Sequence, residues 1–324
     1  MNNNLVKAFN FFKDINRKRG TFPSRILNWQ LLGKFSPALI KIIGVKNVQR
    51  ICDKRHDVTI NYLKEEFSDF LNNYQFSTDS KHNSKIIWSL WLQDYKNAPE
   101  IVKRTLDIMK DYAHQEKYDF ILLNKNNFQK YVNIPEYILD KLNRNLISYA
   151  NFSDILRVAL LAKYGGVWID STVFIRKNFP IYWLELPLFS LKTGKYEDYS
   201  PNVAKNRWKT FLLSGNSALF SFTRDFFFEY FKKYDKAIDY LLIDYIFAIA
   251  YIISKDIREQ IDAIPIANRN LFKLERLLGE KYDQNMWDNL TQNTCVFKTT
   301  YKLNDKILDS KNTYYDYLLN KKIN

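Results

Sequence analysis

The sequence predicts an α/β fold in which helices flank a sheet and a helical extension precedes it. Two changes of pattern along the chain carry this prediction. Residues 1 to about 80 show apolar spacing typical of helices, and a polar, linker-like run follows at 77–84. After it, short apolar strands alternate with helical segments, as in parallel sheets covered by helices. We therefore divide the chain into an extension at 1–80 and a larger α/β domain at 81–324.

The extension is expected to consist of short helices, because breakers occur throughout it. These breakers are Gly20, Pro23, Gly33, Pro37 and Gly44. Residues 1–60 hold twelve Lys or Arg and three Asp, a net charge of +9, whereas the whole chain of 324 residues carries +14. Most of the excess positive charge therefore lies at the front of the chain.

Aromatic and aliphatic side chains lie among these cations, which leaves two interpretations of the extension open. They include Phe9, Phe11, Phe12, Phe22, Trp29, Leu32, Leu39 and Ile42. Such a mixture suits an amphipathic segment that docks on an anionic membrane surface. It equally suits an ordinary helical subdomain with solvated Lys and Arg. Charge alone would also fit nucleic acid, but no zinc, helix-turn-helix or RNP pattern accompanies it.

Membrane crossing and an oxidising compartment are not expected. The longest apolar stretch, 238–253, is interrupted by Asp239 and Asp244, and a span needs about 20 apolar residues. The start of the chain lacks the apolar run of a secretory signal. Cys52 and Cys295 lie far apart and form no CxxC pair, which favours a reducing compartment and argues against cysteine-bound metal.

The larger domain is expected to begin with a strand–helix–strand unit. Residues 85–91 alternate as a strand does, with Trp88 directed to one face. Pro99 suits the first turn of a helix that runs to about Ala113, and residues 118–123 resume as a second strand. The order of these elements predicts parallel pairing between the two strands.

A second helix and strand are expected to deliver an acidic residue to the edge of the sheet. Ser153 is a plausible N-cap, and Gly165-Gly166 ends the helix. Residues 167–169 then form a short buried strand. Asp170 follows its carboxyl end, the edge at which open parallel sheets bind ligands.

Asp154, Arg157 and Asp170 are the candidate functional group. Asp154 and Arg157 lie on one face of the helix, and Asp170 returns one helix and one strand later. A sugar nucleotide needs carboxylates for hydroxyls or a cation, and a positive charge for its diphosphate. The spacing alone fits an intrahelical ion pair and a loop-capping Asp at least as well.

The segment NFSDILRVALLAKYGGVWIDSTVF at 151–174 resembles the donor-binding core of DXD-type glycosyltransferases of family 32, most closely their capsular polysaccharide synthesis branch. Weaker resemblances lie at 85–102, 208–216, 238–245 and 301–306. The resemblance implies a GT-A-like Rossmann-type mixed sheet flanked by helices. It also implies a donor core at 85–175, a helical acceptor-side region at 205–255 and a C-terminal closing segment at 256–324. Residues 1–80 lie outside it.

Carried over by position, the resemblance implies roles for five residues. Trp91 would stack on the nucleotide base. Asp154 and Arg157 would contact the donor sugar and its phosphate side, and Trp168 would line the same pocket. Asp170 corresponds to the first Asp of the DXD motif and would engage the ribose and the metal.

The second acidic position of that motif is Thr172, which departs from the pattern. The resemblance implies Mn²⁺ or Mg²⁺ held by Asp170 and Thr172, but a hydroxyl is a weaker ligand than a carboxylate for such hard cations. Further positions are assigned on the weaker blocks. Asp244 is a third metal ligand or an acceptor-side group, or else a helix-surface carboxylate. Lys302 and Lys306 are expected to clamp the diphosphate, and Asn216 to contact a sugar; solvated lysines and a plain turn are the alternatives.

The resulting expectation is a hexosyltransferase of capsular or other surface polysaccharide synthesis. It would move a hexose from a nucleotide sugar, UDP-linked, to a lipid-linked saccharide, with retention of configuration, at the inner face of the cell membrane. No role is expected for nucleic acid, and the three His lie near no nucleophile. The alternatives are a non-catalytic membrane-docking scaffold with a degenerate transferase fold and, less favoured, a nucleic-acid-binding protein.

Overall fold

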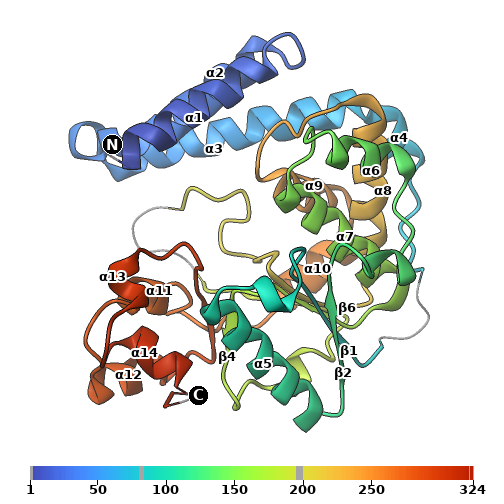
Figure 1. Ribbon diagram of the computed structural model, residues 1–324. Helices are drawn as coiled ribbons and strands as arrows, with labels where there is room; N and C mark the ends of the chain where they lie inside the picture. The colour runs from blue at the N-terminus through green and yellow to red at the C-terminus, as the bar shows by residue number, and fades with distance from the viewer. Residues whose placement is uncertain (1–2, 80–83, 195–199, 321, 324) are drawn as a thin grey trace.

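The computed structural model describes residues 3–79, 84–194, 200–320 and 322–323, and it is built around a five-stranded sheet (Figure 1). The strand order is β2-β1-β3-β6-β5, and a separate pair joins β4 to β7. The strands are β1 Ile86–Leu90, β2 Asp119–Leu123, β3 Val167–Ile169, β4 Val173–Ile175, β5 Leu188–Ser190, β6 Leu212–Gly215 and β7 Val296–Lys298. The predicted linker at 77–84 lies partly outside the described residues.

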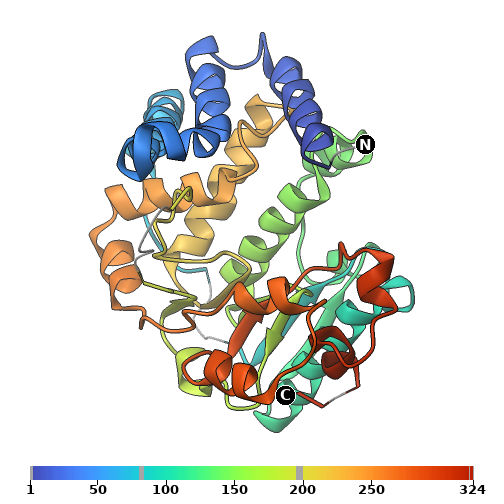
Figure 2. The same ribbon diagram turned by 90° about the vertical axis from the view of Figure 1, so that its left-hand side faces the viewer.

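Helices flank the sheet and also form the N-terminal extension (Figures 1 and 2). The first ten are α1 Asn3–Lys18, α2 Ser24–Phe35, α3 Ile40–Glu66, α4 Ser68–Asn73, α5 Glu100–Gln115, α6 Glu136–Asn143, α7 Tyr149–Tyr164, α8 Ala218–Lys233, α9 Leu242–Ile253 and α10 Lys255–Ala263. Then come α11 Lys273–Leu277, α12 Gln284–Thr291, α13 Asp305–Leu308 and α14 Tyr314–Leu319. Single 3₁₀ turns are η1 Ser36–Leu39, η2 Tyr95–Asn97, η3 Phe128–Lys130 and η4 Ile181–Trp183. The predicted class, an α/β mixed sheet with an N-terminal helical extension, is confirmed.

The main sheet is mixed rather than wholly parallel. β1 pairs in parallel with β2 and β3, as the alternation of strands and helices predicted. β6 then pairs antiparallel with both β3 and β5. The region expected to be helical at 205–255 does contain α8 and α9, but it also contains the strand β6, which was not predicted. Four apolar or small residues are too few to show a strand period.

The parallel strands bring their carboxyl ends to one edge of the sheet. Trp88 lies opposite Trp168 in the register of β1 and β3, so Trp91 and Asp170 leave the sheet at this same edge. The antiparallel β6 reaches the edge with its amino end, because Leu212 lies opposite Ile169. This edge is thus where the predicted ligand-binding residues gather.

Gly166 makes the close approach of α7, β1 and β3 possible. Its φ is +82°, and an added Cβ would lie 2.6 Å from the carbonyl oxygen of Ile86. Backbone cannot move away as a flexible side chain can. The predicted helix stop at Gly165-Gly166 is confirmed, since Gly165 caps α7 with a φ of 66°.

We expect Gly166→Ala to lower the free energy of unfolding by about 2–4 kcal/mol, because left-handed strain and a backbone clash add. Gly20→Ala is the matched control: its φ is +80°, but a Cβ there meets nothing within 4 Å. The free energy of unfolding of that variant should fall only by the cost of the left-handed backbone strain, about 1–2 kcal/mol. Urea unfolding of both variants checks this difference, and equal losses would contradict the role given to the close approach.

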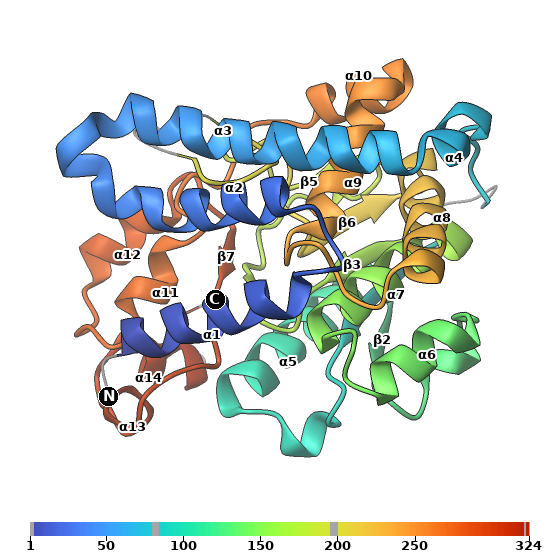
Figure 3. The ribbon, with the colours of Figure 1, turned by 90° about the horizontal axis from the view of Figure 1, so that it is seen from above.

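The N-terminal helices lie across one end of the molecule, with α1, α2 and α3 side by side (Figure 3). Breaks near Gly20, Pro23 and Pro37 and at Gly44 are confirmed, and Gly44 has a non-helical φ of 77° inside α3. The break predicted at Gly33 is wrong. α2 continues through Gly33, and Arg55 of α3 packs against the space that a side chain there would fill.

Buried polar contacts join this extension to the segment that enters α9. Arg55 forms an ion pair of 2.5 Å with Asp239, and Gln30 donates to the carbonyl of Ile238 at 2.9 Å. His56 Nδ1 lies 3.0 Å from the hydroxyl of Tyr245. The extension therefore supports the 238–245 segment directly. Among the described residues, no helix combines the length and the apolar character needed to cross a membrane.

Candidate functional site

Helix α7 begins earlier than predicted. Its N-cap is Ser148, whose hydroxyl accepts a hydrogen bond of 3.1 Å from the amide of Asn151. The predicted cap, Ser153, lies inside the helix. There its hydroxyl and carbonyl both accept from Arg157, at 3.3 and 3.4 Å. Ser153 therefore orients the arginine instead of starting the helix.

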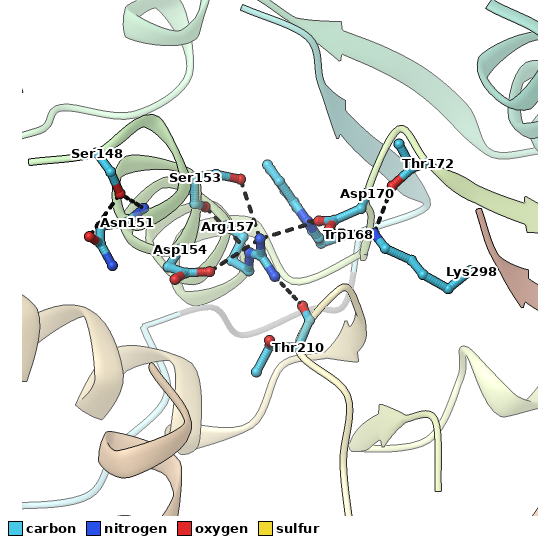
Figure 4. A network of polar contacts seen from close by, with 10 residues as sticks. All are labelled: Ser148, Asn151, Ser153, Asp154, Arg157, Trp168, Asp170, Thr172, Thr210 and Lys298. Atoms are coloured by element: carbon cyan, nitrogen blue, oxygen red, sulfur yellow. Dashed lines mark hydrogen bonds and ion pairs between the residues drawn. The ribbon is translucent and has the colours of Figure 1, made fainter. Parts of the chain in front are cut away.

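Arg157 joins the two predicted carboxylates (Figure 4). One terminal nitrogen lies 3.2 Å from Asp154 Oδ1 and 3.2 Å from Asp170 Oδ1. The other donates to the carbonyl of Thr210 at 2.5 Å. The side chain is only 6% exposed, and its guanidinium lies 5.3 Å from the ring centre of Trp168. The convergence predicted for Asp154, Arg157 and Asp170 is present, but Arg157 is turned toward protein groups on every side.

Asp170 is the most accessible member of this cluster, with a side chain 25% exposed. Trp168 donates from Nε1 to its Oδ1 at 2.9 Å, and Lys298 lies 3.1 Å from its Oδ2. Burial alone would raise the pKa of Asp170, but Arg157 and Lys298 together hold it below its ordinary value. Asp170 is therefore a fixed, ionised carboxylate at the edge of the sheet.

Lys298, the last residue of β7, completes the cluster and was not predicted. Its ammonium contacts Thr172 Oγ1 at 2.7 Å as well as Asp170. The prediction placed this positive charge on Lys302 and Lys306 instead. Both are exposed, and the contact between their segment and the site is that of Tyr301, whose ring meets Trp91 edge-on with ring centres 5.3 Å apart. A single Lys 128 residues from its partner leaves no local pattern in the sequence.

The pair Asp170 and Thr172 does not fit a divalent cation as these side chains stand. It offers one carboxylate and one hydroxyl, and the ammonium of Lys298 contacts both. Within the described part of the chain, no group of three His, Cys, Asp or Glu side chains converges as a metal site. Asp244, expected as a distant third ligand, instead accepts from Trp208 Nε1 at 2.8 Å.

Asp244 is half-buried in the first turn of α9, so it is a helix carboxylate that is only partly exposed to solvent. Burial raises the pKa of Asp244 to about 6, although Trp208 and Lys209 oppose the rise. Burial likewise raises the pKa of Asp154 to about 7, with Arg157 opposing and the charge of Asp244 adding to it. Two of the three carboxyl groups are thus poised to change protonation near neutral pH.

We expect the Asp154→Asn variant to gain stability relative to wild type as the pH rises from 5 to 8. The folded pKa of Asp154, about 7, lies above the ordinary value of 3.8. The folded state therefore holds a proton that the unfolded state has lost, and wild-type stability falls as pH rises through that window. The relative gain should be about 2–3 kcal/mol in urea unfolding.

Asp140→Asn is the control for this pH series, since Asp140 is exposed on α6 and its ion pair with Arg144 is a surface contact. The difference between its free energy of unfolding and that of wild type should stay constant between pH 5 and 8. A constant offset for Asp154→Asn as well would show that Asp154 is not held at a raised pKa.

The remaining predicted residues divide between this edge of the sheet and other places. Trp91 lies at the edge, and its buried Nε1 has no partner among the described residues. Trp168 is fully buried, so it orients Asp170 and does not line a pocket. Asn216 follows the carboxyl end of β6, where Gly215 bonds to Gly166, and therefore lies at the opposite edge. The structure separates Asn216 from the cluster.

One model of a known protein family matches most of the chain. The model described as capsular polysaccharide synthesis protein matches residues 40–318. The chain belongs to this family. The match includes every cluster residue and extends to α3 and α4 of the extension, a wider range than the predicted 85–306. No curated protein matches the chain at a significant level.

Two chains among the solved structures also match. One is described as a crystal structure of a glycosyltransferase involved in the glycosylation of the major capsid of PBCV-1. It is 9% identical, the match covers 72% of this chain and 98% of that one, and the TM-score is 0.32. A similarity this weak assigns neither fold nor activity to this member of the capsular polysaccharide synthesis family.

Two further features of this family member were not predicted. Tyr240 is 72% exposed, and partial burial of its hydroxyl together with the negative charges of Asp154 and Asp170 raises its pKa. A cavity of about 560 Å³ lies at the other end of β7, and its lining includes Trp183 and four amide side chains, those of Asn178, Asn268, Gln292 and Asn293. It contains no cluster residue. We place the site at the cluster, because the buried charges converge there.

Proposed function

We propose that this protein is a glycosyltransferase that moves a hexose from a nucleotide sugar to a saccharide acceptor in capsular polysaccharide synthesis. One observation carries the proposal: an ionised Asp170 is fixed at the carboxyl edge of the sheet by Arg157, Trp168 and Lys298, within a chain of the capsular polysaccharide synthesis family. In open α/β sheets this edge is where ligands bind. Kinship with glycosyltransferase family 32 and its DXD motif stays a prediction.

The donor fits the cluster in one orientation. Trp91 offers an aromatic surface for the nucleotide base. Its Nε1 is buried and has no partner among the described residues, and a uracil carbonyl would be a suitable acceptor once the base displaces the side chains that cover it. Asp170 would accept from ribose or sugar hydroxyls. Lys298, with a side chain 21% exposed, is the cation nearest to a diphosphate bound at Asp170. These three residues lead to a UDP-linked hexose as the proposed donor.

The chemistry that this site would perform is stabilisation of a leaving group. Cleavage at the anomeric carbon develops positive charge on the sugar and negative charge on the diphosphate. A fixed ammonium beside the diphosphate stabilises that negative charge at little cost of reorganisation. Arg157 acts as a positioning residue, because its nitrogens are already engaged by the protein.

We include retention of configuration in the proposal, with attack by the acceptor hydroxyl on the face that the diphosphate leaves. The support for retention is the resemblance of residues 151–174 to transferases that retain configuration. Asp154 is enclosed and Asp170 is bound by two cations, so neither is free to act as the covalent nucleophile of a double displacement, which leaves same-face attack as the retaining route. An α-linked donor should give an α-linked product by NMR. A β-linked product would exclude this part of the proposal.

A thermal-shift screen tests the donor. UDP-, GDP-, CMP- and dTDP-sugars are each added with and without Mn²⁺, since a ligand that binds the native state stabilises it by about 2.7 kcal/mol at a hundred times Kd. We expect UDP-hexoses to raise Tm by a few degrees and the other sugar nucleotides to raise it less. A screen without any stabilising nucleotide would favour the non-catalytic scaffold and overturn the proposal.

The acceptor side of the proposal is a lipid-linked saccharide at an anionic membrane surface. Phe9 and Ile42 of the extension are 68% and 79% exposed, and Phe12 stacks on Phe35 with ring centres 5.3 Å apart. These apolar groups lie in a segment with a net charge of +9. Apolar insertion and attraction to anionic lipids act together in interfacial binding.

Vesicle flotation tests this docking. We expect the protein to float with vesicles containing phosphatidylglycerol, and Phe9→Asp/Ile42→Asp to lose most of that binding. The control Tyr182→Asp/Ile266→Asp makes the same charge change at exposed apolar residues outside the extension and should float as wild type does. Equal flotation of both double variants would remove the extension as the docking surface. A salt-sensitive gel shift with nucleic acid would favour the nucleic-acid alternative.

A further inference from the structure

The ammonium of Lys298 lies where the family resemblance expects a divalent cation. The two side chains expected to hold that cation are Asp170 and Thr172. Lys298 Nζ lies 3.1 Å from Asp170 Oδ2 and 2.7 Å from Thr172 Oγ1 (Figure 4). Both distances are those of ordinary hydrogen bonds from a charged donor. One positive charge of the protein thus occupies the position between both expected ligands.

The backbone holds Lys298 at this place. β7 pairs antiparallel with β4, and Lys298 lies opposite Val173 in the register. The amide and hydroxyl of Thr299 both donate to the carbonyl of Thr172 at 2.8 Å. The amide of Lys298 itself donates to Leu271. The strand that carries the lysine is therefore fixed against the turn that carries Asp170 and Thr172.

The ring of Phe211 lies beside the ammonium, with Nζ 4.8 Å from its centre. An aromatic face attracts a cation and restricts the directions from which water reaches it. An ammonium has three N–H donors. Two of them donate to Asp170 and Thr172. The third is available to a phosphate oxygen, since the side chain is 21% exposed.

Arg157 cannot serve as that cation. Its Nε and both terminal nitrogens contact Ser153, Asp154, Asp170 and Thr210, and its side chain is 6% exposed. A divalent ion is an equally poor fit, because it would have to displace the ammonium or lie beside a like charge. Lys298 is the accessible positive group that remains at Asp170.

We propose that Lys298 takes the place of the divalent cation, so that the protein binds its nucleotide diphosphate without metal. The inference rests on the proposed donor site and adds that the counter-charge comes from the protein chain. The ammonium would donate to a diphosphate oxygen in the bound donor. In the transfer step the acceptor hydroxyl oxygen bonds to the anomeric carbon as the bond between that carbon and the diphosphate oxygen breaks. The hydroxyl proton passes to the leaving diphosphate, and Lys298 stabilises the electron pair left on the diphosphate oxygen.

Calorimetric titration with UDP tests this inference, in EDTA and in Mn²⁺. Wild-type protein should bind UDP in EDTA with a Kd within about threefold of that in Mn²⁺. Lys298→Ala should weaken binding in EDTA by roughly 10- to 100-fold, the usual range for loss of a charge-assisted hydrogen bond. Added Mn²⁺ should restore part of that loss, because Asp170 Oδ2 and Thr172 Oγ1 are then open to an aquated cation.

Two further variants keep the test independent of folding. Lys298→Arg retains the charge and should bind UDP in EDTA within about tenfold of wild type. Lys311→Ala removes one exposed lysine of the C-terminal segment, makes the same charge change and should leave binding unaltered. Equal binding by wild type and Lys298→Ala in EDTA would overturn the inference.

The outcomes separate this inference from the proposed function. If wild-type protein binds UDP in Mn²⁺ but loses it in EDTA, Lys298 does not replace the metal and the inference fails, while the transferase proposal stands. If wild-type protein binds no nucleotide diphosphate or nucleotide sugar in either buffer, the proposed function itself fails.

Discussion

Asp170→Asn should lower kcat/KM for transfer or hydrolysis of the donor by about 10²–10³-fold, the largest effect that we expect from one substitution. The amide keeps the size of the side chain and can still accept from Trp168 at the position now 2.9 Å away. It loses the negative charge that holds Arg157 and Lys298 and that would engage the donor. The loss should therefore appear mainly in activity and nucleotide affinity.

The control for this variant is Asp140→Asn, which removes one exposed carboxylate from α6. Its activity should stay within about twofold of wild type, since exposed ion pairs contribute little. Far-UV circular dichroism and Tm of Asp170→Asn establish that the fold persists. Full activity of a folded Asp170→Asn protein would show that the catalytic site lies elsewhere.

Arg157→Met should lower the free energy of unfolding by about 3–5 kcal/mol, the usual cost of removing one member of a buried ion pair. Asp154 and Asp170 would then lie side by side without the guanidinium that now contacts both at 3.2 Å. Methionine preserves much of the apolar stem, so lost packing contributes little. Urea unfolding at pH 8 gives the measurement.

The pH dependence of this loss identifies its cause. At pH 5 protonation of the carboxyl groups relieves part of their repulsion, so the loss should be smaller than at pH 8. Asp154→Asn/Arg157→Met should recover part of the stability. Arg144→Met is the matched control, because its ion pair with Asp140 is exposed, and it should cost less than about 1 kcal/mol. An equal loss in both arginine variants would contradict the role of Arg157 in holding the cluster.

Much of the sheet could be predicted because its strands and helices have distinct local periods. The predicted strands at 85–91, 118–123 and 167–169 correspond to β1, β2 and β3, and the helix after Pro99 corresponds to α5. The strands β5 and β6 were missed. They are three and four residues long, and runs this short do not by themselves distinguish a strand from a buried turn or helix. β3 is equally short, but the Gly165-Gly166 helix stop marks where it begins, and no such signal precedes β5 or β6.

The site residues that are close in sequence were predicted. Those whose position depends on tertiary contacts were missed. Asp154 and Arg157 share a helical face by spacing, and Asp170 follows a recognisable strand. Ser153 has the residue type of an N-cap, but Ser148, five residues upstream, is also a serine. The structure shows that Ser148 is the N-cap. Lys298 reaches Thr172 through the pairing of β4 with β7, and no local pattern encodes that register.

Hydrogen exchange of backbone amides with and without saturating UDP tests the central claim most directly, because it locates nucleotide binding without assuming turnover. The account predicts slower exchange in the segments around Trp91, Asp170–Val173 and Lys298–Tyr301, which meet at one edge of the sheet. Protection confined to the cavity lined by Trp183 and Asn268, with no change around Asp170, would contradict it.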